Sequence, residues 1–429
     1  MKNELFTALA GVLALVGASA CSSTSSGGDD LFAGGASGGT AAGGGGGMNV
    51  GGAASGGGGS GGGLLIDSGT GTGGGGGPSC DSGPTEDKDK DGQTKQDGDC
   101  NDCDPNANAG AYDVAGNKVD EDCNGTPDDT LTDCDGAITD VADADPMNGA
   151  RAIGLCQQAT ASDKKWGVLE AKWVAADGSP LPTSHADGHG LLAAYGPNVN
   201  CQEGKRLLAL SSGTARQPTD PGYKSPSGAT SPATSPCPTG FPIESPSCNN
   251  AVSGKTANDP AGLELKIRVP TNAKSFSFNF NFYTFEWPSF VCTTFNDFFV
   301  ALLNPATSAQ PPQYGNISFD TQKNPVSVNN AFLEACDPKI GAGNPGGKNF
   351  PCSLGIATLQ GTGFEPGHAA TGWLETVSPI TPGGEMILRY AVWDAGDHIL
   401  DSTVLVDNFK FSADEASNTP TTKPVPTPK

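Results

Sequence analysis

Apolar and polar residues alternate along several stretches in the second half of the chain. The most regular stretch spaces Phe276, Phe278, Phe280 and Phe282 with serine and asparagine, which gives a period of two and one aromatic face. This period predicts a β-strand, because successive side chains of a strand point to opposite faces. We expect the aromatic face to lie in a hydrophobic core rather than to form a binding platform.

The same pattern predicts further strands, which are separated by loops rich in Pro and Gly. Leu169, Ala171 and Trp173 alternate with polar residues. The other candidate strands are 263–269, 316–320, 386–393 and 404–411.

Helical periodicity is almost confined to one short run that ends near Cys156. It follows Asp145-Pro146, a pair typical of an N-cap and a first helical residue. The remaining signals over 132–413 predict a mainly β fold with one large antiparallel β-sandwich or jelly roll. Residues 414–429 are rich in Thr and Pro, so we expect a disordered tail.

Composition separates two further segments from this β-domain. Residues 21–79 are dominated by glycine and bury too little apolar surface to offset the entropy of ordering, so we expect a disordered linker. Residues 80–131 are rich in Asp and poor in apolar residues. They predict a small, loop-rich module that depends on disulfides and metal for its stability.

The charge of the chain is strongly acidic, at −23. Between Asp81 and Asp145 there are 20 acidic and 4 basic residues, so this stretch carries a net charge of −16. A nucleic-acid-binding protein needs Lys and Arg to neutralise phosphates, and that class is excluded. Docking onto anionic lipid through a basic face is disfavoured for the same reason.

Residues 1–20 have the pattern of a signal peptide, with a basic start and an apolar core up to Val16. The following Ala18-Ser19-Ala20-Cys21 resembles a bacterial lipobox, in which the cysteine thiol is acylated. Lipidation of Cys21 would anchor the protein to a lipid bilayer, and Ser22 favours the outer membrane. Plain secretion without an anchor is the alternative.

The cysteine count supports an oxidising compartment. Removing Cys21 from 13 cysteines leaves an even number, which is typical of disulfides in an exported protein. Four of them lie in the Asp-rich module and the rest in the β-domain. The pairs Cys237–Cys248 and Cys336–Cys352 would close short loops, and we expect them on that ground.

The Asp-rich module opens like a calcium-binding loop. Asp87, Asp89 and Asp91 precede Gly92, and oxygens two residues apart can converge on one hard cation. Position 12 of such a loop, normally Glu, is Gly98 here. Further acidic clusters follow in the sequence. The candidate metal ligands are Asp87, Asp89, Asp91, Gln93, Asp97, Asp99, Asp102, Asp104, Asp120 and Asp122.

This module resembles the MopE-like metal-binding repeat of bacterial, myxobacterial-type surface lipoproteins. The matching pieces are Asp87–Gly92, Gly98–Asp102, Asp104-Pro105, Ala109–Ala111 and Val119–Gly125. The resemblance implies an association with copper. The residues themselves favour Ca²⁺, because copper prefers imidazole, thiolate and thioether ligands and the module contains neither His nor Met. A solvated acidic spacer without metal is the remaining alternative.

The β-domain resembles the choice-of-anchor L domain of bacterial surface proteins. The stretches that carry this resemblance are Tyr195–Asn200, Arg206–Ala215, Phe295–Phe299 and Asp401–Phe409. It implies display at the cell surface and no defined activity.

Several polar residues of the β-domain leave its chemistry open. They are Glu286, Asn296, Asp297, Asp394, Asp397, Asp401 and Asp407. They could serve as turn caps, as a structural Ca²⁺ site or, with two facing carboxylates, in glycoside cleavage. His185 and His189 have a spacing that suits zinc, but no third ligand is evident.

Taken together, these features predict a lipoprotein of the cell outer membrane, periplasmic or surface-exposed, and no enzyme. We expect it to display a calcium-stabilised β-domain that adheres to a surface protein or glycan. A carbohydrate-binding or glycoside-cleaving jelly roll is the alternative.

Overall fold

A computed structural model describes residues 81–129, 133–228, 231–243, 245, 248, 251, 254–306, 314–320, 322–329, 354–365 and 367–429. The predicted signal peptide, the lipidation at Cys21, the glycine-rich linker and the pair Cys336–Cys352 lie outside the described residues.

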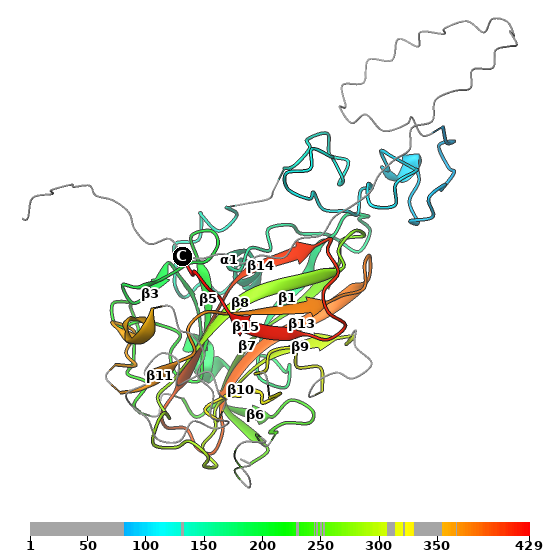
Figure 1. The fold of residues 1–429 in the computed structure, drawn as a ribbon. Helices are drawn as coiled ribbons and strands as arrows, with labels where there is room; N and C mark the ends of the chain where they lie inside the picture. Colours follow the sequence, from blue (N-terminus) through cyan, green and yellow to red (C-terminus); the bar gives the residue numbers. More distant parts are fainter. Residues whose placement is uncertain are drawn as a thin grey trace, which may run out of the picture. The chain divides into compact units, whose positions relative to one another are not determined.

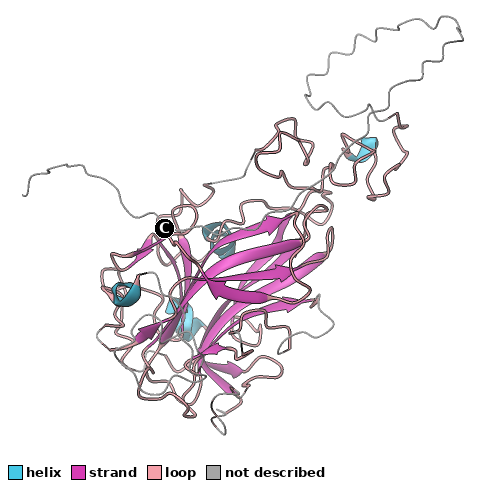
Figure 2. Cartoon of the chain, in the orientation of Figure 1, coloured by secondary structure: helices cyan, strands magenta, loops and turns pink. Residues whose placement is uncertain are grey.

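Strands dominate the described elements, and helices are few and short (Figure 2). In chain order (Figure 1), the elements are η1 (Lys95–Asp97), α1 (Pro146–Ala152), β1 (Gly167–Val174), η2 (Thr183–Gly188), β2 (His189–Leu192), β3 (Ala194–Tyr195), β4 (Val199–Asn200), β5 (Leu207–Ser211), β6 (Thr234–Pro236), β7 (Thr256–Arg268), β8 (Ser275–Thr284), β9 (Phe298–Asn304), β10 (Val326–Ser327), η4 (Gly355–Leu359), β11 (Ala369–Ala370), β12 (Leu374–Pro379), β13 (Glu385–Asp394), β14 (Ser402–Ser412) and β15 (Thr421–Pro424).

Two antiparallel sheets make up most of the fold. One has the strand order β1-β7-β13-β9-β10, with β6 beside β7, and the other has the order β15-β12-β8-β14-β5-β2, with β11 beside β8. The short strands β3 and β4 pair with each other. These pairings confirm the predicted mainly β class and its antiparallel sheets.

The two sheets pack face to face through the aromatic row of β8. The four phenylalanines that alternate along β8 are all buried. Phe278 contacts Tyr390 of β13 with ring centroids 4.9 Å apart, and Phe280 contacts Phe299 of β9 at 5.0 Å. Since β13 and β9 belong to the opposite sheet, these contacts form the centre of a β-sandwich. The expectation that the aromatic face is core is confirmed.

The outer faces of the sandwich are covered as well. Tyr195, Tyr283 and Leu405 belong to a second buried cluster outside one sheet, and Phe298 and Trp393 to a third outside the other. Strands buried on both faces lose the alternation of apolar and polar residues. The continuous apolar runs of β5 and β9 therefore escaped an analysis based on a period of two.

The disordered tail expected at 414–429 is a wrong prediction. Strand β15 extends the second sheet by pairing with β12, and Thr422 lies opposite Thr376. The two threonine hydroxyls are 2.9 Å apart, and Thr422 is buried. Thr is β-branched and suits a strand, while Pro is tolerated at a sheet edge, so a Thr/Pro-rich composition fits an edge strand.

The predicted helix is present but short. The Asp145 side chain accepts a hydrogen bond from the Met147 amide, and Pro146 occupies the first turn, as predicted. The helix ends at Ala152 rather than near Cys156. The candidate strand at 316–320 is wrong, because this stretch forms only isolated bridges.

The disulfides differ from the loop-length expectation. The described pairs are Cys100–Cys123, Cys134–Cys156 and Cys248–Cys292. Cys237 is a free thiol, so the predicted pair Cys237–Cys248 is wrong. A short loop lowers the entropic cost of closing a disulfide, but the fold decides which cysteines come close enough to pair.

Replacing Phe280 by Ala should lower the free energy of unfolding by about 3–5 kcal/mol, because the change leaves a cavity between the sheets. Ile356→Ala is the control, since Ile356 is 61% exposed; it should change stability by no more than about 0.5 kcal/mol. Chemical denaturation of the oxidised protein measures both. Equal effects of the two changes would contradict the assigned core.

Removing residues 416–429 should lower the midpoint of thermal unfolding and speed the amide hydrogen exchange of β12, because β12 becomes an edge strand. Hydrogen exchange read out by mass spectrometry locates the effect. Unchanged exchange in β12 of the truncated protein would contradict the pairing of β15 and support the prediction of a disordered tail.

Candidate metal centres

The opening half of the predicted calcium loop is formed. Carboxylate oxygens of Asp87, Asp89 and Asp91 all lie within 4.8 Å of one another. The amides of Lys90 and Gly92 donate to the Asp87 carboxylate, at 2.7 and 3.2 Å. Gly92 has a φ of 91°, a conformation that favours glycine. The loop therefore curls around its own aspartates as the spacing predicted.

A second cluster lies deeper and shares one member with the first. Asp89, Asp99 and Asp102 offer carboxylate oxygens within 4.8 Å of one another, and Asp99 and Asp102 are buried. In each of the three, the Oδ2 atom is buried and has no hydrogen-bond partner. The Oδ1 atoms of Asp99 and Asp102 accept from backbone amides of Asn101 and Lys88. Burial raises the pKa of Asp99 to about 6.

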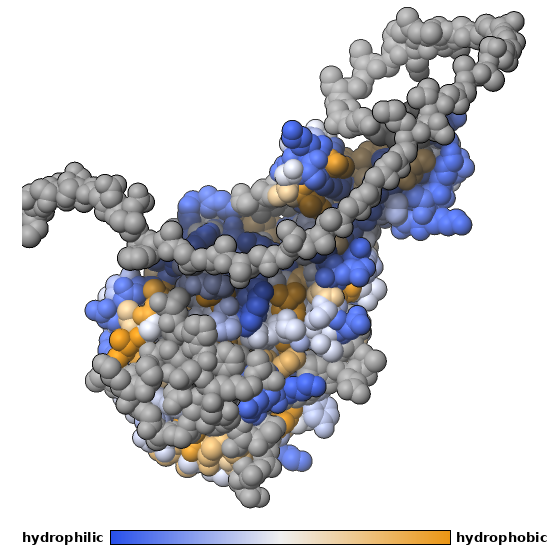
Figure 3. Space-filling model, viewed as in Figure 1, coloured by the Kyte–Doolittle hydropathy of each residue, from blue (hydrophilic) through white to orange (hydrophobic). Residues whose placement is uncertain are grey.

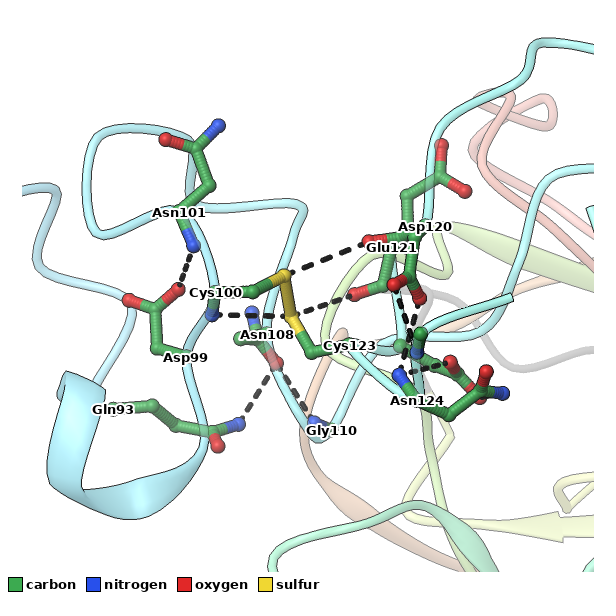
Figure 4. The surroundings of a disulfide bond; sticks show 12 residues. Gln93, Asp99, Cys100, Asn101, Asn108, Gly110, Asp120, Glu121, Cys123 and Asn124 are labelled. Carbon is green, nitrogen blue, oxygen red and sulfur yellow. Dashed lines mark hydrogen bonds between the residues drawn. A yellow bond between two sulfur atoms is a disulfide. The ribbon is translucent and has the colours of Figure 1, made fainter. Parts of the chain in front are cut away.

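Asn108 connects this loop to its surroundings. Its Oδ1 accepts hydrogen bonds from Gln93 Nε2 and from the Gly110 amide, at 2.8 and 2.9 Å (Figure 4). Its Nδ2 donates to Asp91 at 2.7 Å. The disulfide Cys100–Cys123 joins this part of the module to the next acidic loop (Figure 4). Covalent and polar links thus take the place of an apolar core.

A third cluster contains two residues that the sequence analysis missed. Asp113, Asp122 and Asp129 present carboxylate oxygens within 4.8 Å of one another. Asp113 accepts from the amides of Glu121, Asp122 and Asp129, and burial raises its pKa to about 6. These residues also line a cavity of about 490 Å³. Asp113 and Asp129 stand apart in the sequence and lack the two-residue spacing, so only the fold reveals them.

The other predicted ligands lie outside these clusters. Asp97 accepts from Thr94, Asp104 from Asn106, and Asp120 from the Asn124 and Gly125 amides. Gln93 donates its side-chain amide to Asn108. The part of the Asp-rich segment that is described is mostly hydrophilic at its surface (Figure 3). Ligation by any of the predicted residues stays a prediction.

A fourth cluster is buried in the β-domain. Glu286, Asp297 and Asp394 are 1%, 0% and 0% exposed, and their carboxylate oxygens lie within 4.8 Å of one another. Asp297 accepts hydrogen bonds from the Ser402 hydroxyl, at 2.6 Å, and from the Ala395 amide, at 3.2 Å. Both Asp394 oxygens and Oε2 of Glu286 receive no hydrogen bond from a donor group of the protein. Asp394 and Asp297 are close enough to share a hydrogen bond when one of the two is protonated.

Burial raises the pKa of all three groups, although hydrogen bonds from Ser402 and Ala395 and with Asp394 lower that of Asp297. The pKa rises to about 9 for Glu286, to about 7 for Asp297 and to about 12 for Asp394. Burial is the largest cause in each case, and neighbouring carboxylates, among them Asp397, add to it. The site therefore strongly disfavours three bare negative charges.

The other polar residues considered in this domain have separate surroundings. Asn296 accepts from the Asn329 amide, Asp397 from the Ile399 amide, and Asp407 from the Gln202 amide. The Asp397 contact is that of a local turn, whereas the Asn296 and Asp407 contacts join residues far apart in the sequence. Asp401 is buried, and neither of its carboxylate oxygens has a hydrogen-bond partner. Burial raises the pKa of Asp401 to about 9.

The comparison with protein families matches the Choice-of-anchor L domain to residues 183–412, more than half of the chain. The chain belongs to the choice-of-anchor L family. It is therefore a cell-surface-associated protein, and this family is not a known enzyme family. No curated protein matches the chain.

The choice-of-anchor L domain contains the buried carboxylates, whereas the Asp-rich clusters precede it. Strands β1 and β15 lie outside 183–412 yet pair with β7 and β12. The sandwich of this chain is thus larger than the matched range. Within the described residues, the helices are too short to cross a bilayer.

His185 and His189 occupy the interior of the domain. Both are buried, and their Nε2 atoms lie 3.0 Å from the Ser211 carbonyl and 3.1 Å from the Asp143 carbonyl. His189 also stacks on Trp173 with ring centroids 4.0 Å apart. Neither histidine belongs to a cluster of three metal-binding side chains among the described residues. Packing and carbonyl contacts account for their positions.

The burial of His189 predicts acid sensitivity. Burial lowers its pKa from 6.5 to about 4, so between these pH values the unfolded chain binds more protons than the folded one. The stability that neutral His189 contributes is complete above pH 6.5 and falls by about 3 kcal/mol as the pH drops to 4. The free energy of unfolding, measured by denaturation across this range, should fall less steeply with decreasing pH for His189→Gln than for the wild type. Parallel pH profiles for the two proteins would contradict the lowered pKa of His189.

Proposed function

We propose that this protein is a surface-tethered binding protein without catalytic activity, in which Ca²⁺ orders the Asp-rich module ahead of the choice-of-anchor L domain. The observation that carries the metal is the cluster of Asp89, Asp99 and Asp102, each with a buried oxygen that lacks a hydrogen-bond partner. Buried carboxylate oxygens without a hydrogen-bond partner are costly, and a divalent ion removes that cost.

The ligand chemistry favours Ca²⁺ over copper. The segment 81–129 contains no His and no Met. Cys100, Cys103 and Cys123 are disulfide-bonded and offer no thiolate. Carboxylate and carbonyl oxygens remain, and these are the ligands of hard cations. This argument stands against the copper association that a MopE-like repeat would imply.

The anchor in this proposal is an acylated Cys21, which would hold the protein at the outer membrane. The glycine-rich linker that follows would let the β-domain reach a surface protein or glycan, since such chains extend by roughly 5–6 Å × √n. The family supports the surface location, and the lipobox-like sequence supports the lipid.

Binding is favoured over cleavage by the position of the carboxylates. Glycoside hydrolysis needs two carboxylates that face a substrate, and Glu286, Asp297 and Asp394 are buried. Among the described residues, Tyr314 is the one aromatic side chain that is mostly exposed. A row of exposed aromatic residues, which a sugar platform would need, is not formed by the part of the chain that the structure describes.

The double change Asp89→Asn with Asp102→Asn should weaken Ca²⁺ binding at the Asp-rich module at least tenfold, because changes even in the surroundings of a metal cost about 10–100-fold in affinity. Calorimetric titration of the full chain measures this, and limited proteolysis of the module reports its ordering. Asp81→Asn is the matched control and should leave Ca²⁺ binding unchanged, because Asp81 is exposed, lies outside the clusters and is not among the predicted ligands.

Three results would count against the proposal. The first is that the double variant binds Ca²⁺ as tightly as the wild type. The second is that the module of the wild type resists protease equally well with and without a chelator. The third is that Cu²⁺ binds more tightly than Ca²⁺. The first two results remove the metal from the module, and the third changes its identity.

A further inference from the structure

The inward-facing rows of four strands end together at one end of the sandwich. In β13, Tyr390 and Val392 face the core, whereas Ala391 and Trp393 belong to the cluster on the outer face. Asp394 continues the inward row by one step. Asp394 thus places a carboxylate at a position where the period of two predicts another apolar core residue.

The neighbouring strands end in the same way. Phe299 of β9 faces the core, and Asp297 lies two residues before it. Phe282 of β8 faces the core, and Thr284 and Glu286 follow at the same period. Ser402 precedes the inward Val404 of β14 and donates to Asp297. Strands β8 and β14 belong to one sheet and β9 and β13 to the other, so the polar ends lie between the two sheets.

This end of the core gathers negative charge without a basic partner. None of the ion pairs among the described residues involves Glu286, Asp297 or Asp394. Asp394 is fully buried, and both of its oxygens lack a hydrogen-bond donor although they lie within reach of the other two carboxylates. An arrangement of this kind needs protons or a cation to be stable.

We propose that Glu286, Asp297 and Asp394 form a structural Ca²⁺ site that joins the two sheets of the choice-of-anchor L domain. Two oxygens bound to one Ca²⁺ at about 2.3–2.6 Å can be up to roughly 5 Å apart, and the three carboxylates satisfy this limit with 4.8 Å. The Thr284 hydroxyl accepts a hydrogen bond from the Glu286 amide at 3.2 Å, which holds the backbone that carries the Glu286 carboxylate.

The donor set selects the class of ion. All three side chains offer carboxylate oxygen, which suits hard cations and not copper or iron–sulfur chemistry. Mg²⁺ prefers to keep several of its waters, whereas Ca²⁺ accepts an irregular shell of protein oxygens. A dry site at the end of a hydrophobic core therefore favours Ca²⁺. This site is separate from the Asp-rich module, and either can exist without the other.

The test isolates the buried site by disabling the other clusters. The full chain carries Asp89→Asn, Asp102→Asn and Asp122→Asn as a common background. It is unfolded in a chelator with its disulfides intact and refolded with or without Ca²⁺, because an ion in a buried site exchanges slowly. Onto this background, Asp394→Asn or Glu286→Gln is added; both changes keep the size of the side chain and remove a charge.

Ca²⁺ should raise the thermal midpoint of the background protein by about 5 °C or more at saturating concentration. Asp394→Asn should abolish this shift. In the chelator, Asp394→Asn should unfold at the same temperature as the background protein or higher, because it removes one of three repelling carboxylates. The proposal is wrong if Asp394→Asn keeps the full calcium-dependent shift, or if the background protein shows none.

Terbium supplies a second measurement, and its first part uses only the background protein, so it does not depend on whether Asp394→Asn or Glu286→Gln folds. Trp287 and Trp393 adjoin two of the ligands in sequence, so excitation at the red edge of indole absorption should sensitise Tb³⁺ luminescence in the background protein. Ca²⁺ should displace this signal, and Glu286→Gln should weaken Tb³⁺ binding at least tenfold. Absence of sensitised luminescence in the background protein would show that protons, not a metal, neutralise the three carboxylates.

Failure of the proposed module site and failure of the proposed buried site give different results. If the module site is wrong, the Asp89 and Asp102 changes have no effect on Ca²⁺ binding in calorimetry. If the buried site is wrong, the background protein shows no calcium-dependent shift of its thermal midpoint. The two proposals are therefore tested separately.

Discussion

The packing of two sheets through their inward-facing rows is the constraint on which the rest of the choice-of-anchor L domain depends. Phe278 and Phe280 of one sheet meet Tyr390 and Phe299 of the other, and burial of these rings aligns the three strands β8, β13 and β9. Once the rows are aligned, their ends are aligned too. Residues that are remote in sequence, such as Glu286 and Asp394, are then brought together without any local motif.

The Asp-rich module follows a different physical logic. It has little apolar surface to bury, so hydrophobic packing cannot order it. Asp carboxylates instead accept hydrogen bonds from backbone amides of their own loops, as Asp87 and Asp99 do, and Cys100–Cys123 closes the connection. Such turns fix the backbone but leave other carboxylate oxygens directed at one another. The same residues thus shape the loop and create the repulsion that a cation would relieve.

The sequence predicted the class of the fold and the local turns, because both depend on neighbouring residues. The alternation in β8 and the Asp-x-Asp-x-Asp-Gly spacing each have a direct structural consequence. Strands β5 and β9 were missed because both of their faces are buried, and β15 because edge pairing depends on what lies beside it. Asp113, Asp129 and the buried carboxylates could not be grouped from spacing, since strand pairing and long loops determine their distances. The pair Cys248–Cys292 escaped prediction for the same reason.

Hydrogen bonds between the Asp-rich module and the β-domain couple the ordering of the module to one connection of the β-domain. Asn108 receives a hydrogen bond from Thr271 and donates one to Asp91, and Asn272 exchanges two hydrogen bonds with the backbone of Tyr112. Thr271 and Asn272 belong to the connection between β7 and β8, and β8 carries the central aromatic row. A cation held by Asp91 and its neighbours would therefore fix Asn108 and, through it, this connection. Because these links are polar and local, they would orient the module against the sandwich while leaving the stability of the core to the packing of its rings.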